Sequence, residues 1–385
     1  MDCLIIGCGL CGIVAARRLA EAGKQVTIIE KRNHIGGNIY DFCNHDGILI
    51  QRYGPHSFFT DRKDIKDYIE QFSPTRDSFV EYRTMINGQA IPMPFNFKSI
   101  DLLYQKVEAE ELKKRLLDAY PGQEIISVTS LVEHSDPMIK AYGTFMFRNE
   151  YQLYSAKQWG RPIDSIEPAV FNRVPVYLSY RKPYQRHPYQ FLPVGGFTKL
   201  ASRMIDHPNI TLELEVDALA HLALRETGRI FWDGEELKCP VLYTGQLDEL
   251  FNYTYGTLPY RSLEFIWKTL PIESFQETGI VAYPQADKIT RITEYTKLPY
   301  QHVKGKTIIA IEIPFEYTPG SPFGGEPYYP VLTAQTKDLY YRFLKASQKY
   351  PTLFLGGRLA DYRYYNMDDV ILRGWQVADN ILSIY

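Results

Sequence analysis

The chain has 385 residues, of which 45% are apolar and 23% charged, a composition typical of a globular protein large enough for two or three domains. Its formal net charge of −2 excludes bulk electrostatic attraction to nucleic acid or to an anionic membrane surface. We recognise no secretory leader and no apolar stretch near the roughly 20 residues that span a bilayer, so we expect a cytoplasmic protein without membrane insertion.

The first 30 residues predict a dinucleotide-binding βαβ unit. The apolar run CLII is followed by a G-x-G-x-x-G motif at Gly7, Gly9 and Gly12, then by an Ala- and Leu-rich helix that ends at Gly23. A second apolar strand, QVTIIE, ends in Glu30. In such a unit the glycines allow a tight turn, close approach of a pyrophosphate and close helix packing, and the acid accepts a hydrogen bond from a ribose hydroxyl.

The segment after the second strand favours FAD over NAD. Its sequence, KRNHIGGN at 31–38, resembles the second part of the FAD fingerprint of glutathione-reductase-like flavoproteins. Arg32 can meet a phosphate, and the two glycines that follow allow the backbone to approach a cofactor. Near the C-terminus, residues 352–382 run strand, glycine turn, helix, and resemble the segment that closes over the flavin in those proteins.

The middle of the chain predicts inserted subdomains. Helical periodicity covers 99–120 and 138–160, and a hairpin is predicted at 83–95 with Asn87 and Gly88 at its turn. Further strands are expected at 210–218, 229–234, 239–245 and 306–315. The five cysteines, Cys3, Cys8, Cys11, Cys43 and Cys239, match no zinc-site spacing, so we expect reduced thiols and no metal.

We therefore predict an α/β fold with a Rossmann-like, glutathione-reductase-like FAD-binding domain, an inserted helical subdomain and an inserted antiparallel β-sheet. The FAD-binding domain is expected to be discontinuous, over 1–75, 193–250 and 345–385. The helical domain, with a mobile substrate loop, is expected at 96–170. The sheet domain takes the remainder, 76–95, 171–192 and 251–344.

Stretches rich in Tyr, Trp and Arg indicate an anionic, ring-bearing ligand. They include YSAKQWGRP, NRVPVYLSY, TRITEY, EPYYP and GRLADYRYYNMDD. Guanidinium groups clamp phosphates, tyrosine hydroxyls donate to phosphate oxygens and aromatic faces stack on a base, which together suit a nucleotide sugar. No second nucleotide fingerprint occurs, which argues against a built-in NAD(P)H site.

Over essentially its whole length the sequence resembles the UDP-galactopyranose mutases, flavoenzymes that interconvert UDP-galactopyranose and UDP-galactofuranose. The landmarks are the N-terminal motif, GGNIYD, YGPH, KQWG, RVPV, TRITE, PYYP and GRLADYRYYNMD, in that order. The resemblance implies that reduced FAD acts through N5 as the nucleophile at the anomeric carbon, with no net redox change. It also implies a homodimer that acts on UDP-galactose.

The resemblance implies a role for individual residues. Arg173 and Arg291 match the diphosphate arginines, Tyr154 the tyrosine that stacks on uracil, and Trp159 the same substrate-lining segment. Further diphosphate donors are Tyr184, Tyr329 and Tyr364. His56 matches a histidine beside the flavin, which either tunes flavin protonation or holds the local backbone. The cofactor residues implied are Gly7, Gly9, Leu10, Gly12, Glu30, Lys31, Gly37, Asn38, His56, Gly245, Arg358, Tyr364 and Met367.

The sequence departs from the family pattern at three places. Phe59 stands where a second histidine is frequent, Glu150 and Tyr151 lie where Phe-Phe is frequent, and Asn366 replaces an aspartate. Three alternatives therefore stay open. The first is a mutase for another nucleotide sugar, such as UDP-N-acetylgalactosamine or a dTDP-sugar. The others are a flavin oxidoreductase of the amine-oxidase type and a catalytically silent nucleotide-sugar binder.

Overall fold

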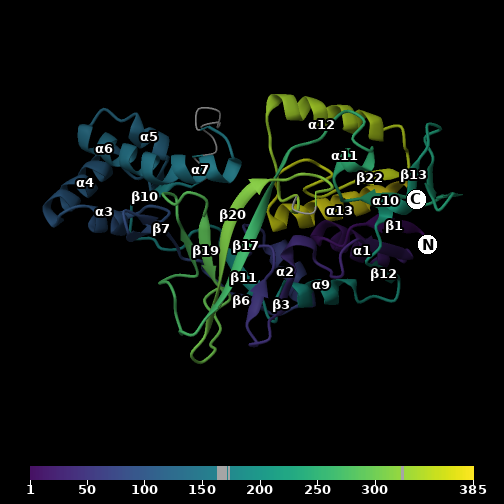
Figure 1. Cartoon of the computed structure of the whole chain (residues 1–385), viewed down its shortest axis with the longest axis horizontal. Coiled ribbons are helices and arrows are strands. Elements are labelled where there is room, and N and C mark those ends of the chain that lie inside the picture. The colour runs from purple at the N-terminus through teal and green to yellow at the C-terminus, as the bar shows by residue number, and fades with distance from the viewer. Residues whose placement is uncertain (163–170, 172–173, 322–324) are drawn as a thin grey trace.

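A computed structural model describes residues 1–162, 171, 174–321 and 325–385. Figure 1 shows a lobe of short helices at one end, a larger lobe in which helices cover a sheet at the other, and long twisted strands between them. Both termini lie in the larger lobe, so the chain leaves it and returns (Figure 1). This arrangement confirms the α/β class predicted from the sequence, and the predicted domain boundaries stay a prediction.

The larger lobe is built on a five-stranded parallel sheet. Its order is β12 (Ile210–Leu214), β2 (Val26–Glu30), β1 (Cys3–Ile6), β16 (Val241–Tyr243) and β22 (Leu353–Leu355). Strands β1 and β16 are wholly buried, because helices cover both faces. One face packs on α1 (Leu10–Glu21), α9 (Phe197–Ile205) and α13 (Met367–Ile384), and the other on α12 (Ala334–Ser347).

Glycines flank helix α1, close to both ends that the sequence predicts. Gly9 is its N-cap residue, and Gly23 follows its end with φ of 86°. A Cβ atom at Gly12 would overlap the carbonyl oxygen of Gly7. Gly12 therefore lets the first turn of the helix pack directly on the glycine turn, which is the role predicted for it.

A seven-stranded sheet joins the two lobes. Its order is β21-β17-β20-β19-β18-β7-β8, and its longest strands are β17 (Tyr260–Leu270) and β20 (Thr307–Glu316). The predicted hairpin forms, with Asn87 and Gly88 at φ of 51° and 78° between β7 and β8. All neighbouring strands are antiparallel except β18 and β7, which pair in parallel. The remaining strands of this sheet are β7 (Tyr82–Ile86), β8 (Gln89–Met93), β18 (Ile280–Ala282), β19 (Arg291–Glu294) and β21 (Tyr329–Pro330).

The smaller lobe is helical, with two departures from the sequence prediction. The helix expected at 99–120 is two helices, α3 (Phe97–Leu103) and α4 (Lys106–Ala119), because Tyr104 is extended and ends the first. The helix expected at 138–160 is α6 (Pro137–Met146), a π-helical turn η2 (Phe147–Tyr151) and α7 (Gln152–Trp159) in succession. Helix α5 (Val128–Val132) completes this lobe among the described residues.

The remaining short elements lie outside the two large sheets and the helices described above. They are η1 (Gly37–Ile39), β3 (Asp41–Cys43), β4 (Leu49–Gln51), β5 (Phe58–Thr60), α2 (Lys63–Phe72), β6 (Thr75–Asp77), β9 (Ile125–Ile126), β10 (Val176–Tyr177), β11 (Tyr189–Pro193), α10 (Ala218–His221), β13 (Leu222–Leu224), β14 (Ile230–Trp232), β15 (Glu235–Glu236) and α11 (Leu247–Leu250). None of the helices in the described ranges is both long and apolar enough to cross a membrane.

Candidate active site

The glycine turn borders a cavity at the carboxyl ends of β1 and β2. Gly7 has φ of 105°, and a Cβ atom there would overlap the hydroxyl of Thr244, so this position requires glycine. At Gly9 a Cβ atom would meet nothing within 4 Å, because the residue faces the open cavity. Gly37, with φ of 56°, packs beside Gly9 and extends the same wall. Backbone thus approaches the cavity closely at the N-terminus of α1, as a pyrophosphate site requires.

All the residues predicted to bind the cofactor line this cavity, except Gly12 and Tyr364. The predicted residues in its wall are Gly7, Gly9, Leu10, Glu30, Lys31, Gly37, Asn38, His56, Gly245, Arg358 and Met367. Gly12 lies beneath the turn, as described above. The ring of Tyr364 lies beneath the guanidinium group of Arg358, with 5.4 Å between the ring centre and Cζ. The residues predicted from the sequence therefore lie together around one cavity.

Glu30 is fixed at the end of β2 by backbone amides. Its Oε2 accepts a hydrogen bond from the amide of Cys8 at 2.7 Å, and its Oε1 accepts one from the amide of Arg32 at 2.9 Å. The side chain is 6% exposed and lines the cavity. Each carboxylate oxygen has a further lone pair, so the group can also accept from a ribose hydroxyl.

Arg32 brings a cation to the cavity wall. Its guanidinium group forms an ion pair with Glu326 at 2.5 Å and donates to Oδ1 of Asn38 at 3.0 Å. Burial alone would lower the pKa of Arg32, but Glu326 offsets that effect and the pKa is raised. Glu326 lies shortly before Tyr328 and Tyr329 in the chain, so the ion pair links the cofactor cavity to the segment that carries Tyr329.

One end of the cavity was missed by the sequence analysis. Residues 216–219 follow β12 and line the cavity, and the amide of Val216 donates to the carbonyl of Glu30 at 3.1 Å. The sequence analysis expected a strand to 218, whereas β12 ends at Leu214. The signal was the Asp217 that follows, because Asp before a short helix is a typical N-cap, and its side chain does accept from the amide of Leu219.

Arg291 begins strand β19 and is paired with a buried carboxylate. Its Nε lies 2.8 Å from Oε2 of Glu312, which is its direct neighbour on β20 and is 2% exposed. Burial alone would lower the pKa of Arg291, but Glu312 and nearby tyrosines outweigh it, so the pKa is raised and the group is charged. The sequence analysis missed Glu312, although a lone acid within the apolar strand KTIIAIEIPF was a usable signal.

Tyrosines from separate segments surround Arg291. The ring of Tyr82, on β7, lies 5.1 Å from that of Tyr184, and the Tyr82 hydroxyl interacts with Tyr154 of α7. Tyr329, on β21, stacks on Tyr364 with ring centres 6.1 Å apart. Burial raises the pKa of Tyr329 to about 12, although Arg291 lowers it, so the phenol is protonated at neutral pH and can donate to an anion.

Tyr82 was not predicted as a site residue, because only the parallel pairing of β7 with β18 brings it here. Its pKa is raised by burial, so its phenol is also neutral at physiological pH. Trp159 is the last residue of α7, and Gly160 after it has the left-handed conformation that ends a helix. Arg173 lies outside the described residues.

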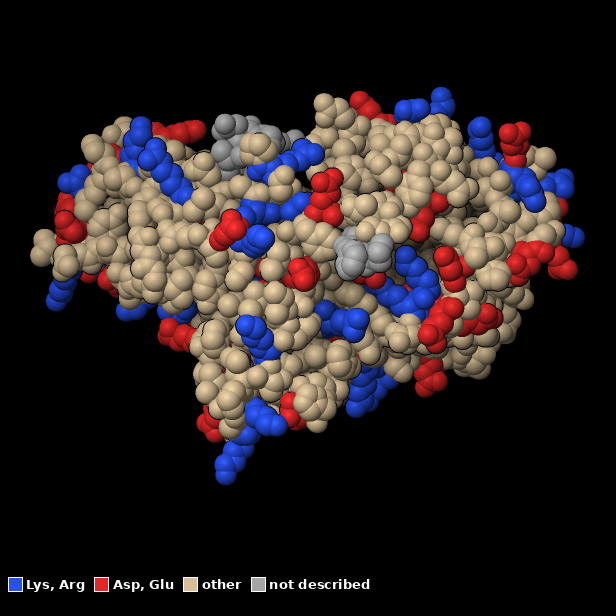
Figure 2. Space-filling view, in the orientation of Figure 1, with Lys and Arg blue, Asp and Glu red and all other residues tan. Residues whose placement is uncertain are grey.

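Arg358 and His56 join this cluster to the cofactor cavity. Both line the cavity, and the guanidinium group of Arg358 lies over the rings of Tyr329 and Tyr364, at 5.7 and 5.4 Å. Arg358 also donates to the carbonyls of Tyr328 and Tyr365, which hold it there. The cavity and the tyrosine cluster therefore share a wall. On the face seen in Figure 2, Lys and Arg side chains gather near the central hollow, although acidic groups are interspersed.

His56 is held by the backbone and is neutral. Its amide donates to Oε1 of Gln51 at 2.6 Å, and its Nδ1 lies 2.9 Å from the carbonyl of Gly54. Burial, together with the charges of Arg358 and Arg291, lowers the pKa of His56 to about 4. A neutral ring with Nδ1 donating to Gly54 leaves Nε2 as an acceptor. This favours the second of the two roles considered for His56, that of holding the local backbone, over a proton switch near neutral pH.

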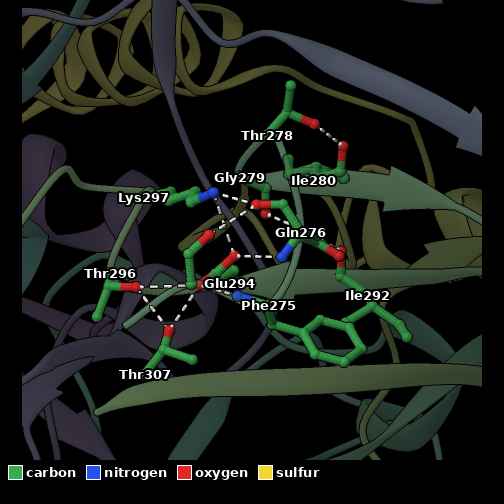
Figure 3. Close-up of polar contacts among 11 residues, drawn as sticks. Phe275, Gln276, Thr278, Gly279, Ile280, Ile292, Glu294, Thr296, Lys297 and Thr307 are labelled. Carbon is green, nitrogen blue, oxygen red and sulfur yellow. Dashed lines mark hydrogen bonds and ion pairs between the residues drawn. The ribbon is translucent and has the colours of Figure 1, made fainter. Parts of the chain in front are cut away.

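Strand β19 is anchored at the end opposite Arg291. Figure 3 shows the carboxylate of Glu294 at the centre of a polar network. Glu294 is fully buried and accepts from the amides of Phe275 and Gln276 at 2.9 and 3.0 Å and from the hydroxyl of Thr307 at 2.8 Å. The ammonium group of Lys297 lies 3.6 Å from the same carboxylate. Because these contacts pin the strand, they also limit where Arg291 can move.

Glu150 lies in the π-helical turn that precedes α7. It is 4% exposed and accepts a hydrogen bond from the hydroxyl of Thr84 on β7. Burial raises its pKa to about 7, while Thr84 and Lys157 lower it. Of the other departures from the family pattern, Phe59 stacks on His187 at 4.9 Å, and Asn366 is the N-cap of α13.

Comparisons with known proteins agree with this geometry. The model of the family described as UDP-galactopyranose mutase matches residues 149–364, and the model of the NAD(P)-binding Rossmann-like domain matches residues 5–72. UDP-galactopyranose mutase of Mycoplasma pneumoniae is 33% identical over 99% of this chain and 96% of its own length. The dTDP-fucopyranose mutase of Escherichia coli is 29% identical over 97% of each chain. The crystal structure of reduced UDP-galactopyranose mutase covers 100% of this chain and 96% of its own, with a TM-score of 0.71 at 16% identity, a likeness in fold.

The different surroundings of Gly9 and Gly12 lead to a paired prediction. Gly12→Ala will lower the free energy of unfolding of the apoprotein, by about 1–3 kcal/mol, because the new methyl group overlaps backbone. Gly9→Ala will leave that free energy within about 0.5 kcal/mol of the wild type but will abolish dinucleotide binding, because its methyl group enters the cavity. Urea unfolding of the apoproteins and FAD titration measure both effects. Full FAD binding by Gly9→Ala would contradict the assignment.

Glu150 leads to a prediction about pH. Between its ordinary pKa of 4.5 and about 7, the folded protein holds a proton that the unfolded chain has released, so the free energy of unfolding falls as pH rises through this window. Glu150→Gln removes this dependence. Between pH 5 and pH 8, the free energy of unfolding of Glu150→Gln will rise relative to that of the wild type by on the order of 1–3 kcal/mol. The exposed Glu226→Gln is the control, and equal pH profiles for wild type and Glu150→Gln would show that Glu150 ionises normally.

Proposed function

The chain belongs to the UDP-galactopyranose mutase family, and on that basis we propose that it interconverts UDP-galactopyranose and UDP-galactofuranose without net oxidation or reduction. The observation that carries the proposal is the shared wall at Arg358 and His56. A cavity with the features of a dinucleotide site lies on one side, and a guanidinium group among protonated tyrosines lies on the other. A redox cofactor and an anionic sugar nucleotide would meet there.

The cofactor proposed is FAD in its reduced form. The cavity fits it, because Gly9 leaves room for a pyrophosphate at the helix N-terminus, Glu30 offers carboxylate oxygens to a ribose, and Arg32 offers a cation. When bound, reduced FAD supplies a nucleophilic nitrogen, N5, to the anomeric carbon of the sugar. This supply explains why the reaction needs no nucleophilic Ser or Cys from the protein.

The chain's own residues hold the substrate and stabilise the leaving diphosphate. Charge builds up on the diphosphate as the bond to the anomeric carbon breaks, and a cation already in place stabilises it most in a site that excludes water. Arg291 is such a group, because Glu312 fixes its orientation before substrate arrives. We propose Arg173 as the second cation, and Tyr184, Tyr329 and Tyr364 as donors to the diphosphate oxygens.

Helix α7 is the proposed binding site for the base. Tyr154 projects from it toward Tyr82 and Arg291, so its ring can stack on a pyrimidine while the attached diphosphate reaches the guanidinium group. Trp159 lies at the end of the same helix. Holding base and diphosphate together keeps the sugar near the shared wall, and keeps the nucleotide in place for recombination.

A second candidate is a mutase for another nucleotide sugar. The similarity to the dTDP-fucopyranose mutase of Escherichia coli spans 97% of the chain, and a diphosphate site would serve either substrate. UDP-N-acetylgalactosamine is a further possibility of the same kind. An amine oxidase requires an apolar substrate cage, whereas the site here contains a charged Arg291 and several phenols. The division into three domains, the homodimer and the cytoplasmic location stay predictions.

Removal of Arg291 tests the proposed function. Arg291→Ala will lower turnover of UDP-galactofuranose by about 10²–10³-fold, because the leaving diphosphate loses its fixed cation. Arg173→Ala will act in the same direction. Arg291→Ala will keep FAD, since Arg291 does not line the cofactor cavity. We expect Arg173→Ala to keep FAD as well. Turnover is followed by separating the two UDP-sugars by chromatography.

The exposed Arg148→Ala, on the turn before α7, is the matched control and will keep wild-type turnover. Loss of FAD from Arg291→Ala would show that Arg291 supports the cofactor domain instead. Unchanged turnover in Arg291→Ala with FAD bound would contradict the proposed role of Arg291 at the leaving diphosphate.

A further inference from the structure

We propose that Lys157 is a positioning residue that fixes the base-binding helix α7 relative to the strand that carries Arg291. The inference rests on the proposed function and extends it to a residue that makes no contact with the ligand. Lys157 lies on α7, three residues after Tyr154, so the two side chains leave the helix on neighbouring parts of its surface. Its ammonium group reaches the turn between β18 and β19.

The ammonium group of Lys157 is saturated by carbonyl oxygens. It donates to the carbonyls of Tyr283, Ala286 and Ile289 at 2.6, 2.6 and 2.7 Å. An ammonium group has three N–H donors and no acceptor, so these three bonds use all of them. Lys157 therefore has no donor left for a phosphate, and a direct role in substrate binding is excluded by geometry.

The carbonyls that Lys157 binds belong to the segment that leads into Arg291. Ile289 precedes Arg291 by two residues, and the amide of Thr290 between them donates to the carbonyl of Glu312 at 3.0 Å. The far end of β19 is already pinned by Glu294 (Figure 3). Lys157 thus fixes the one end of this strand that faces α7.

Helix α7 depends on such polar contacts, because none of its residues is fully buried. An ordinary surface helix is held by a buried apolar stripe, which α7 lacks. Its C-terminal carbonyls, of Lys157 and Gln158, accept from the guanidinium group of Arg261 at 3.2 and 3.0 Å. Arg261 holds the last carbonyls of α7 to β17, and the Lys157 side chain holds the same last turn to the segment before Arg291.

The electrostatic surroundings of Lys157 agree with a buried tether. Burial lowers its pKa to about 8, while Glu150 and Asp287 raise it, so the group is mostly charged at neutral pH. The guanidinium group of Arg261 faces the carbonyl of the same residue. A charged donor strengthens each bond to a carbonyl and makes the loss of the group costly.

The experiment compares UDP, which spans α7 and the strand that carries Arg291, with a ligand that contacts only the strand side. In the proposed site UDP contacts both Tyr154 and Arg291, whereas inorganic pyrophosphate contacts Arg291 and the other residues that bind the diphosphate, but not Tyr154. In the FAD-loaded full chain, Lys157→Met will raise the Kd of UDP at least tenfold and that of pyrophosphate less than twofold. In turnover the KM for UDP-galactofuranose will rise in parallel, and kcat will stay within threefold, because Arg291 and the tyrosines are kept.

The matched control is Lys288→Met, which removes an exposed lysine from the same turn and will leave both Kd values unchanged. Lys157→Arg keeps the charge but presents a planar fork to three converging carbonyls, so it will weaken UDP binding to an intermediate degree. This variant supplies the test if Lys157→Met fails to fold.

Wild-type affinity for UDP in either Lys157 variant would overturn the inference, as would equal losses for UDP and pyrophosphate. Failure of the wild-type protein to bind UDP is a different result. It would contradict the proposed function itself, and the inference with it.

Discussion

The buried ion pair between Arg291 and Glu312 is the interaction on which the rest of the site depends. A cation that binds a diphosphate beside a cofactor is shielded from bulk water, and a buried cation needs a carboxylate partner in good geometry. Here the partner is the cross-strand neighbour, so the register of β19 and β20 fixes the guanidinium group. The protonated phenols around it add donors without adding charge. The site is therefore selective for an anion before any ligand arrives.

The position of that pair explains the layout of the chain. The seven-stranded sheet extends from the cofactor lobe to the helical lobe (Figure 1). It carries Tyr82, Arg291 and Tyr329 on three separate strands. The C-terminal segment returns to the cofactor lobe and supplies Arg358, which touches both the cavity and the tyrosines. In the proposed function, the described part of the helical lobe presents Tyr154 of α7 to the site. Since α7 has no buried residue, its place is set by polar contacts with the sheet.

Much of the cofactor site was predictable, because its requirements are local. The glycine turn and Glu30 follow directly from one βαβ unit, and their spacing alone predicts the cavity that they line. Glu312 and Lys157 were not predicted from the sequence. The role of Glu312 depends on the register that places it opposite Arg291, and the role of Lys157 depends on a turn that packs against α7. The family resemblance supplied Arg291 and Tyr154, but not the reason they lie together. The π-helical turn before α7 has no pattern in sequence periodicity, since it changes the period for a single turn.

The central claim is that a redox cofactor serves a reaction with no net redox change. The most direct test is conversion of UDP-galactofuranose to UDP-galactopyranose by the FAD-bound protein, run anaerobically with and without dithionite. The account predicts UDP-galactopyranose in the reduced sample alone, with many turnovers for each reduced flavin. Product in neither sample, with FAD bound, would contradict it, as would product formed only once for each flavin reduced.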